Sequence, residues 1–373
     1  MYDYLIVGAG ISGATFARVA AEDGKKVLVI DKSDVVGGLS KTITDKDTGI
    51  IVHKFGPHIF HTSSSKVWKF VNRFCNMMPF VNTPMAKVGD SIYNLPINMN
   101  TISRVFNITD PQEAIKFMEN EVENYEDAPS NFEEACKSKV GTKLFEMFFK
   151  GYTEKQWHAD CTNVPADVFS SRQPIRFTYN NNYFNDIYQG IPYEGYTEMI
   201  TNMLCHENID VALDTEYDIN SNLFANIANK VVYTGTIDRL FNYCEGCIRY
   251  NSLNFENVIL DINNFQGNAV VNYCDADIPY TRITEHKFFN TYNEAFNSDH
   301  TIITYETPQV YVVDKNVPMY PVAAGKNTYS KYLKYIPDNM ILLGRLATFE
   351  YLNMDTAIER AMAAYDTDSA KED

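Results

Sequence analysis

The stretch YLIVGAGISGATFARVAAEDGKKVLVID at residues 4–31 decides the fold of this chain. It contains an apolar strand, the spacing Gly8-x-Gly10-x-x-Gly13, a helical run closed by a glycine, and a second apolar strand that ends at Asp31. The three glycines permit a tight turn, a close approach of backbone to a pyrophosphate, and close packing of the helix on the strand. We predict a βαβ unit that binds a dinucleotide, with the helix N-terminus facing the pyrophosphate.

Two features beyond this fingerprint bear on which dinucleotide is bound. The fingerprint alone does not separate FAD from NAD, and the carboxylate of Asp31 would accept hydrogen bonds from ribose hydroxyls in either case. The pair Gly37-Gly38 follows Asp31 by six residues, which is the usual continuation in flavoproteins of the glutathione-reductase type. A late Gly344-Arg345 can close the second side of a flavin. We therefore predict FAD.

Length, charge and cysteine content restrict the partners. At 373 residues the chain is too long for one core and predicts two or three lobes. Its formal net charge of −16 predicts repulsion from nucleic acid and anionic membranes, so a phosphorylated substrate would need arginines gathered locally. No apolar run approaches the roughly 18 residues that span a membrane. The lack of a signal-peptide pattern and the odd number of cysteines, seven, favour reduced thiols in the cytoplasm.

Beyond residue 31 the pattern changes from helices to mixed strands. Helical spacing or capping predicts helices at about 62–74, 110–124, 132–150 and 355–365. Apolar runs predict strands at about 93–96, 230–234, 269–273, 301–305 and 340–343. The segment 151–192 has no strong period and is expected to form functional loops. The tail 366–373 is expected to fray.

This order predicts an α/β protein, a discontinuous FAD-binding Rossmann domain with an inserted helical lobe and an antiparallel β-sheet lobe. We expect the Rossmann domain at 1–80, about 215–245 and 335–373. The helical lobe is expected at about 98–155. The sheet and substrate-binding lobe is expected at about 81–97, 156–214 and 246–334.

Short segments spread along the whole chain carry a more specific signal. They are HIFHT (58–62), NLPINMNT (94–101), GYTEKQW (151–157), NNYF (181–184), YQGIP (188–192), NFQGNA (264–269), PYTRI (279–283) with EHK (285–287), YPV (320–322) and GRLA (344–347). In these segments, and nearly end to end from Tyr2 to about Ala361, the chain resembles the bacterial-type UDP-galactopyranose mutases.

The resemblance implies an isomerase that interconverts UDP-galactopyranose and UDP-galactofuranose, or a closely related UDP-sugar. It implies that reduced FAD acts through its N5 as a nucleophile toward the sugar, so that the flavin must be reduced although no net redox change occurs. It further implies a cytoplasmic homodimer, a cellular reductant derived from NAD(P)H, and a role in cell-surface polysaccharide biosynthesis. It implies no bound metal.

The resemblance also carries over residue roles. The expected catalytic residues are Arg172, Arg282, His61 and Asn353. The expected substrate-binding residues are Asn82, Tyr152, Thr153, Trp157, Tyr183, Asn272, Tyr320 and Tyr351. The expected cofactor-binding residues are Gly10, Ile11, Ser12, Gly13, Asp31, Lys32, Gly38, Leu39, His58, Ile59, Arg345 and Met354. The two arginines would grip the diphosphate bidentately and stabilise UDP as leaving group, and Arg172 would lie on a mobile loop near 160–180.

At several positions the chain departs from the family pattern. Asn353 stands where an aspartate is usual, Leu39 replaces an asparagine, and Pro57 replaces a small residue. We read these changes as a sign that the sugar could differ from plain galactose, for example by an N-acetyl group. Two other functions stay open, a UDP-sugar-binding homologue with low activity and a flavin oxidoreductase of the amine-oxidase type.

Two sequence pairs invite a metal interpretation. His58-x-x-His61 lacks an evident third ligand, and the same holds for Cys244-x-x-Cys247, which stands without a second pair. We interpret the histidines as flavin-side residues and the cysteines as free thiols.

Overall fold

A five-stranded parallel sheet, which begins with the N-terminal strand, forms the centre of the Rossmann lobe. The computed structural model describes residues 1–170 and 175–370. Five parallel strands lie in the order β10-β2-β1-β11-β17. Their bounds are Tyr2–Val7 for β1, Val27–Ile30 for β2, Ile209–Ala212 for β10, Ala228–Tyr233 for β11 and Met340–Leu342 for β17. The βαβ unit predicted from residues 4–31 is present as β1, α1 (Ile11–Glu22) and β2, and the α/β fold class is confirmed.

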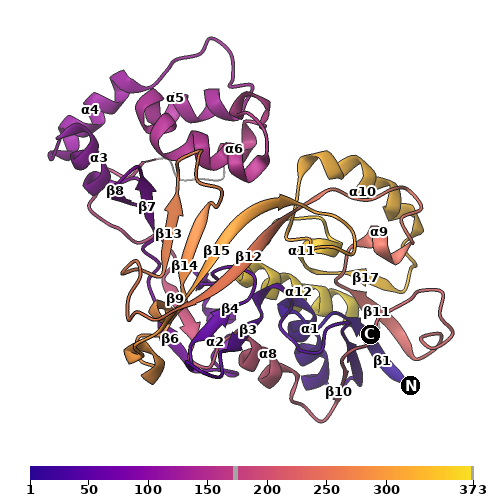
Figure 1. Cartoon of the computed structure of the whole chain (residues 1–373). Helices are drawn as coiled ribbons and strands as arrows, with labels where there is room; N and C mark the ends of the chain where they lie inside the picture. The colour runs from indigo at the N-terminus through magenta and orange to yellow at the C-terminus, as the bar shows by residue number, and fades with distance from the viewer. Residues whose placement is uncertain (171–174, 371–373) are drawn as a thin grey trace.

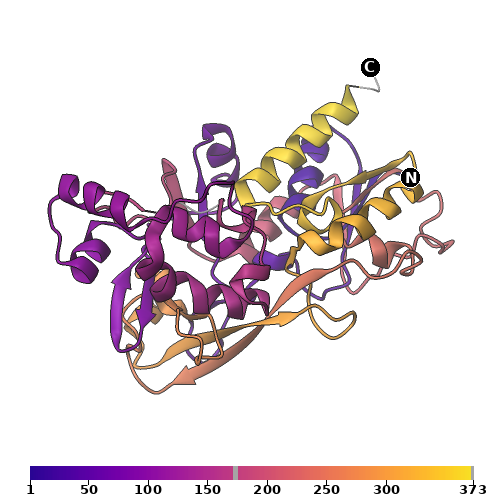
Figure 2. The ribbon, with the colours of Figure 1, turned by 90° about the horizontal axis from the view of Figure 1, so that it is seen from above.

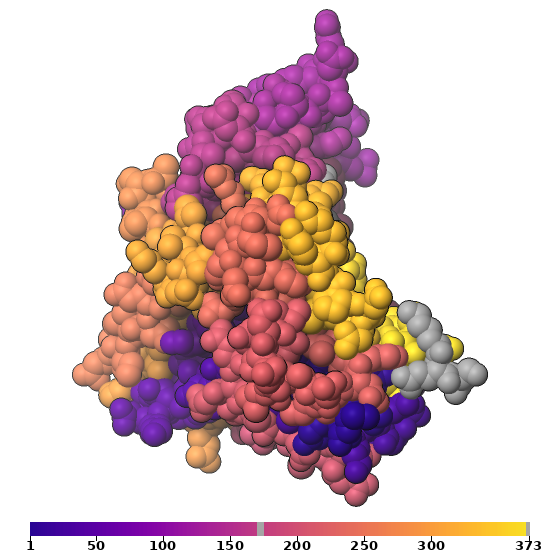
Figure 3. Space-filling model, turned by 90° about the vertical axis from the view of Figure 1, so that its right-hand side faces the viewer, coloured from indigo at the N-terminus to yellow at the C-terminus, as the bar shows by residue number. Residues whose placement is uncertain are grey.

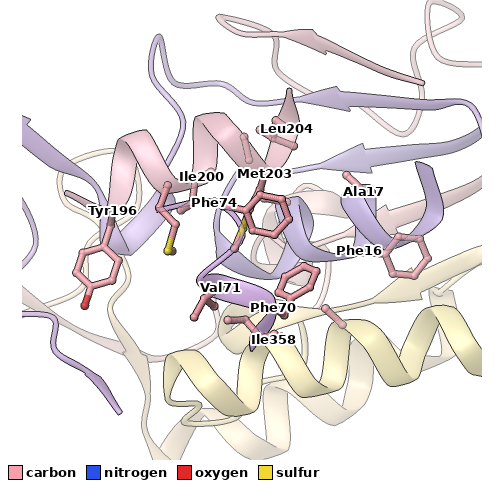
Figure 4. Close-up of a cluster of buried hydrophobic side chains, with 14 of the residues drawn as sticks. Phe16, Ala17, Phe70, Val71, Phe74, Tyr196, Ile200, Met203, Leu204 and Ile358 are labelled. Atoms are coloured by element: carbon pink, nitrogen blue, oxygen red, sulfur yellow. The ribbon is translucent and has the colours of Figure 1, made fainter. Parts of the chain in front are cut away.

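Four helices bury their apolar faces together beside this sheet. They are α1, α2 (Ser65–Val71), α8 (Tyr196–Leu204) and α12 (Met354–Ser369). Figure 4 shows Phe16 of α1, Phe70 of α2, Ile200 of α8 and Ile358 of α12 in one cluster. These segments come from four distant parts of the sequence, so burial of this cluster holds the Rossmann lobe together. Three shorter helices pack in a second apolar cluster with strands β11 and β17 of the same sheet. They are α9 (Ile237–Leu240), α10 (Lys326–Tyr332) and α11 (Gly344–Ala347).

A second, larger sheet rises from the Rossmann lobe toward the helical lobe (Figure 1). Its strands lie in the order β16-β12-β15-β14-β13-β7-β8. The bounds are Tyr320–Pro321, Tyr250–Leu260, Thr301–Val310, Arg282–Glu285, Val270–Tyr273, Met85–Val88 and Ser91–Asn94, in that order. One pair, β13 with β7, is parallel, whereas the others are antiparallel, so the expected purely antiparallel lobe is a mixed sheet.

Two small sheets join the lobes. The first pairs β3 (Thr42–Thr44) with β4 (Ile51–His53), and the second has the order β5-β9-β6. The bounds of the second are Phe60–Thr62 for β5, Tyr188–Pro192 for β9 and Met77–Pro79 for β6. Because β9 follows the segment predicted to bind substrate, its pairing with β5 brings residues near 184–189 beside His61.

The helical lobe projects from the end of the seven-stranded sheet (Figure 2), and the space-filling view shows it as a protrusion at the top of the molecule (Figure 3). Its helices are α3 (Met99–Phe106), α4 (Pro111–Glu121), α5 (Phe132–Leu144), α6 (Gly151–Trp157) and α7 (Asp167–Ser170). A π-helical turn, Phe145–Lys150, joins α5 to α6. Asn98, Asp110 and Asn131 cap α3, α4 and α5 by accepting hydrogen bonds from backbone N–H groups.

Four details differ from the sequence-based expectations. The segment from residue 151 begins with a helix, α6, rather than with a loop. The long strand β12 was not predicted. Strand β10 pairs with β2 in the Rossmann sheet, although it lies in the segment expected in the substrate lobe. Helix α12 continues to Ser369, well into the expected frayed tail, because the Asp368 carboxylate accepts hydrogen bonds from β1 and β11.

Candidate active site

The glycine fingerprint forms a tight loop between β1 and α1. Gly8 has a φ of +112°, and a Cβ there would lie 2.0 Å from Thr234 Oγ1. A Cβ at Gly13 would lie 2.0 Å from the Gly8 carbonyl oxygen, so each position excludes any larger residue. The Asp31 carboxylate accepts hydrogen bonds from the backbone N–H groups of Ala9 at 2.7 Å and Ser33 at 2.8 Å. These bonds hold the end of β2 against the loop.

Two distant glycine segments close around this loop. A Cβ at Gly38 would lie 3.1 Å from the Gly10 Cα. A Cβ at Gly344, which has a φ of +81°, would lie 3.2 Å from Ser12 Oγ. Fingerprint, double glycine and late glycine therefore meet at one place, as predicted for a bound dinucleotide. Leu39 follows at the start of a short 3-10 turn and is half-buried, and Lys32 is exposed.

The N-terminus of α1 suits an anion. Its N-cap is Gly10, which offers no side chain, and no acidic residue lies in its first turn within the described chain. The N-terminal N–H groups of a helix and its dipole favour a negative group there, and a pyrophosphate fits. The residues present thus match the phosphate-binding half of an FAD site, and Gly10, Ile11, Ser12 and Gly13 would hold it.

Arg345 supports the loop before α12. Its guanidinium donates to the carbonyl oxygens of Met319 at 3.1 Å and Leu352 at 2.7 Å, and lies over the Tyr351 ring at 4.6 Å from the ring centroid. Burial lowers its pKa. Arg345 therefore connects β16 to the loop that carries Tyr351. Asn353 is the exposed N-cap of α12 and makes no capping side-chain hydrogen bond, and Met354 is the first helical residue.

The two histidines of HIFHT have different environments. His58 Nδ1 lies 2.8 Å from the Gly56 carbonyl oxygen, and burial lowers the pKa of His58 to about 4. The ring is therefore neutral near pH 7, with Nδ1–H donating and Nε2 left as an acceptor. His61 Nδ1 lies 2.7 Å from the Asp186 carboxylate, and its ring stacks on Phe184 at 3.7 Å between centroids. Both rings have partners in the protein, and Ile59 between them is buried.

Asp186 also connects to the start of α2. Its second carboxylate oxygen accepts a hydrogen bond from Ser63 Oγ at 2.7 Å. Burial alone would raise the pKa of Asp186, but the hydrogen bonds from Ser63 and His61 hold it below its ordinary value. The carboxylate is therefore charged at neutral pH and fixes the orientation of the His61 ring.

Arg282 begins strand β14 and faces helix α6. Its Nη2 lies 3.5 Å from the Tyr152 hydroxyl and its guanidinium 3.7 Å from the Glu306 carboxylate on the neighbouring strand. Burial opposes its charge, but Glu306 and Tyr152 together raise its pKa, so it remains a cation. Burial raises the pKa of Glu306. A quarter of the Arg282 side chain is exposed, which leaves it accessible to an anion.

Three predicted site residues, the catalytic Arg282 and the substrate-binding Thr153 and Asn272, carry buried polar atoms that lack a partner. Among the described residues, Thr153 Oγ1, Asn272 Oδ1 and Arg282 Nε make no hydrogen bond. Asn272 on β13 lies directly across from Arg282 on β14, and Thr153 follows Tyr152 on α6. An unpaired buried polar atom costs about 1–3 kcal/mol, so a group of them beside a cation is typical of a ligand site.

Tyr320 is held as a hydrogen-bond donor. Its hydroxyl oxygen accepts from Gln156 Nε2 of α6 and from Asn251 Nδ2 of β12, the latter at 3.4 Å. Burial raises the pKa of Tyr320 to about 12, so it stays protonated. Since its oxygen already accepts two bonds, its own proton can be donated elsewhere, as a phosphate oxygen requires. Tyr351 lies 6.3 Å away between ring centroids and is exposed.

The remaining predicted residues lie around this group or outside the described chain. The Tyr183 N–H donates to the carbonyl oxygen of Asn82 at 2.8 Å, and the Tyr183 ring is exposed. Trp157 ends α6 and packs on the core of the helical lobe. Arg172, expected to be the second diphosphate arginine, lies outside the residues that the structure describes.

Four residues that sequence reasoning missed contact the predicted site residues. Glu306 and Asn251 sit on strands whose pairing places them beside Arg282 and Tyr320. Gln156 lies inside a quoted segment and Asp186 lies between two of them, but their partners are more than a hundred residues away in sequence. No local pattern signals such a pairing. Cys244 and Cys247 are exposed free thiols.

Comparisons with known proteins agree with this geometry. A family model described as UDP-galactopyranose mutase matches residues 147–351, and one described as an NAD(P)-binding Rossmann-like domain matches residues 6–74. A probable UDP-galactopyranose mutase of Klebsiella pneumoniae is 39% identical over 97% of this chain and 93% of its own length. The chain belongs to the UDP-galactopyranose mutase family. A dTDP-fucopyranose mutase of Escherichia coli is 37% identical over 97% of each chain.

A solved structure shows the same fold. The crystal structure of a reduced UDP-galactopyranose mutase superposes with a TM-score of 0.75 at 16% identity, over 99% of this chain and 94% of the other. As a member of the UDP-galactopyranose mutase family, the chain is a flavin-dependent isomerase. Within residues 1–170 and 175–370, no helix has the length and apolar character needed to cross a membrane.

Proposed function

We propose that this protein interconverts the pyranose and furanose rings of a sugar linked to a nucleoside diphosphate, with UDP-galactose as the primary substrate. The observation that carries the proposal is the pair formed by Arg282 and Asn272 across β14 and β13, with the buried Thr153 next to Tyr152 on α6. Arg282 is an accessible cation whose Nε has no partner, and Asn272 Oδ1 and Thr153 Oγ1 are two further unpaired buried atoms. A diphosphate and the polar groups of a nucleotide sugar would satisfy all of them.

The protein's own residues would perform the binding and the charge stabilisation. Reduced FAD, when bound, supplies a nucleophilic nitrogen for attack on the sugar. Gly10, Ser12 and Gly38 would hold the cofactor by backbone contacts. Arg282 would bind the diphosphate and stabilise it as leaving group, and Tyr320 would donate a hydrogen bond to a phosphate oxygen. The assignment of Arg172 as the second arginine is part of this proposal.

The identity of the sugar is the open part of the proposal. The two relatives at 39% and 37% identity are named for different nucleotide sugars, so overall similarity does not choose between them. Asn353, in place of the usual aspartate, is exposed at the N-cap of α12 and removes a negative charge from the loop that carries Tyr351. UDP-galactose, an N-acetylated analogue and dTDP-fucose therefore form the test panel.

The decisive experiment is chromatography of each pyranose and furanose pair after incubation with chemically reduced enzyme. We expect ring interconversion with reduced enzyme and none with oxidised enzyme. Preference for UDP-galactofuranose over its N-acetyl analogue would reject the modified-sugar hypothesis. If only dTDP-fucose were interconverted, the proposed substrate would be wrong but the proposed ring interconversion would stand.

A binding homologue without turnover is the second candidate, and the exposed Asn353 favours it. It would bind UDP with full flavin reduction but form no product from any sugar in the panel. An oxidase of the amine-oxidase type would instead consume oxygen in step with substrate, without prior reduction. A reductant derived from NAD(P)H, a homodimer and a cytoplasmic location complete the proposal, and gel filtration tests the dimer.

A further inference from the structure

Helix α6 contacts the hairpin of β13 and β14 at three positions. Gly151 lies so close that a Cβ would meet the carbonyl oxygen of Cys274 at 2.4 Å. The Tyr152 hydroxyl then lies 3.5 Å from Arg282 Nη2. One turn further along α6, the Lys155 side chain reaches the loop of the hairpin. Helix α6, which carries the expected substrate residues Tyr152, Thr153 and Trp157, and the hairpin, which carries Arg282, therefore share one contact surface.

The Lys155 ammonium is held entirely by backbone. Its Nζ donates to the carbonyl oxygens of Tyr273 and Asp275, each at 2.8 Å, and of Tyr280 at 3.0 Å. An ammonium has three N–H donors, and this loop accepts three. Tyr273 ends β13, whereas Tyr280 lies two residues before Arg282. The ammonium thus fixes both arms of the hairpin relative to α6.

We propose that Lys155 is a positioning residue that sets the distance between α6 and Arg282, and through it the fit of the nucleotide diphosphate. This inference rests on the proposed function, because it concerns the same binding site. Lys155 would touch neither substrate nor flavin. Its effect would appear in binding, since one ligand must satisfy the expected contacts on α6 and the phosphate contact of Arg282 on β14 together.

Protonation of Lys155 provides a way to observe this role. Burial lowers its pKa to about 8, and the nearby Cys274, Asp275 and Asp277 oppose that shift. The titratable groups on the elements around it include Cys274, Asp275 and Asp277 of the loop, Lys87 of β7, and Tyr152 and Glu154 of α6. The hairpin adds Arg282, together with Tyr273 and Tyr280, whose pKa values are raised by burial. A neutral amine has two donors and a lone pair, so one carbonyl would face a lone pair and the hairpin would loosen.

The test uses UDP alone as the probe on flavin-loaded enzyme. Binding of UDP is titrated calorimetrically at intervals from pH 6.5 to 9.5 for wild type, Lys155→Met and Lys155→Arg. Lys150→Met, at an exposed lysine paired with Glu146, is the matched control. Thermal melting and flavin absorbance of every variant check folding. Because the titration of UDP itself is the same for all variants, differences in the pH dependence of binding between variants arise from the protein.

We expect Lys155→Met to raise the UDP dissociation constant about tenfold at pH 7. Wild type should lose affinity as the pH rises through 8, and Lys155→Arg, which keeps its charge, should lose that dependence. If Lys155→Met does not fold, the wild-type and Lys155→Arg profiles decide. Equal affinity in Lys155→Met, or an unchanged profile in Lys155→Arg, overturns the inference alone. Wild type that does not bind UDP overturns the proposed function as well.

Discussion

Replacement of Thr153 by valine should strengthen the fold and weaken substrate binding. Thr153 Oγ1 is buried and has no partner in the part of the chain that the structure describes. Valine has nearly the same shape but no hydroxyl, so it removes the unpaired polar atom without opening a cavity. If the hydroxyl serves the ligand, the two effects must have opposite signs.

The size of each effect follows from the buried hydroxyl. Leaving it unpaired costs about 1–3 kcal/mol, so its removal should raise the unfolding free energy of the ligand-free protein by about 1 kcal/mol. In a chain of this length that corresponds to a rise of about 1–2 °C in Tm. Loss of one neutral hydrogen bond to the ligand should weaken UDP binding by about 1 kcal/mol, or roughly fivefold.

A second buried threonine provides the matched control. Thr101 in α3 is equally buried, but its Oγ1 donates to the Asn94 carbonyl oxygen at 2.6 Å. Thr101→Val should therefore lower the unfolding free energy by about 1–2 kcal/mol and leave UDP binding unchanged. Both threonines lie in helices, so the cost of a β-branched residue cancels between the two variants.

The assays are thermal melting with and without UDP and titration of UDP at fixed salt. The reasoning would be refuted if Thr153→Val destabilised the protein as Thr101→Val is expected to do. It would equally fail if Thr153→Val bound UDP as tightly as wild type. Either outcome would mean that the hydroxyl has a structural partner or that the ligand does not reach it.

Two further changes test the cofactor cradle and the histidine pair. Gly13→Ala places a Cβ 2.0 Å from the Gly8 carbonyl oxygen, so the purified variant should lose most of its flavin absorbance. Gly24→Asn is the control, because a Cβ at Gly24 would meet no atom within 4 Å and asparagine tolerates a positive φ, so this variant should keep its flavin. Asp186→Asn removes the carboxylate that orients His61 and should lower kcat about tenfold with flavin retained. Because the pKa of Asp186 is held low, its stabilising effect is present above the ordinary pKa of an aspartate and lost as the pH falls through the lowered value, so acid unfolding of the two proteins should converge there.

The nucleotide-binding loop could be predicted from residues 4–38 because its requirements are local. Gly8 needs a positive φ and Gly13 a missing side chain, and both demands are met within one βαβ unit. The resemblance likewise predicted that Arg282, Thr153 and Asn272 belong to one site, and that assignment stays a prediction. Residue identity was sufficient there, since the resemblance extends over nearly the whole chain.

Strand β12 and the end of α12 needed the tertiary structure. In residues 250–260 polar and apolar side chains occur on both faces without strict alternation, so it is their pairing with β15 that defines them as a strand. The last turns of α12 persist because Asp368 accepts bonds from Tyr4 and Lys230, which lie 364 and 138 residues away in sequence. A contact between residues so far apart does not appear in the hydrophobic periodicity of the sequence.

By itself, the sequence determined the dinucleotide loop and the family, and it supplied the predicted site residues, because glycine geometry and side-chain chemistry are properties of single positions. Only the tertiary structure decided how those residues are held: Tyr320 by Gln156, His61 by Asp186, and the Arg282 hairpin by Lys155. Each of these bonds joins segments more than 100 residues apart. Their partners are therefore set by how the lobes and sheets meet in space, and a linear chain does not encode that in any local spacing.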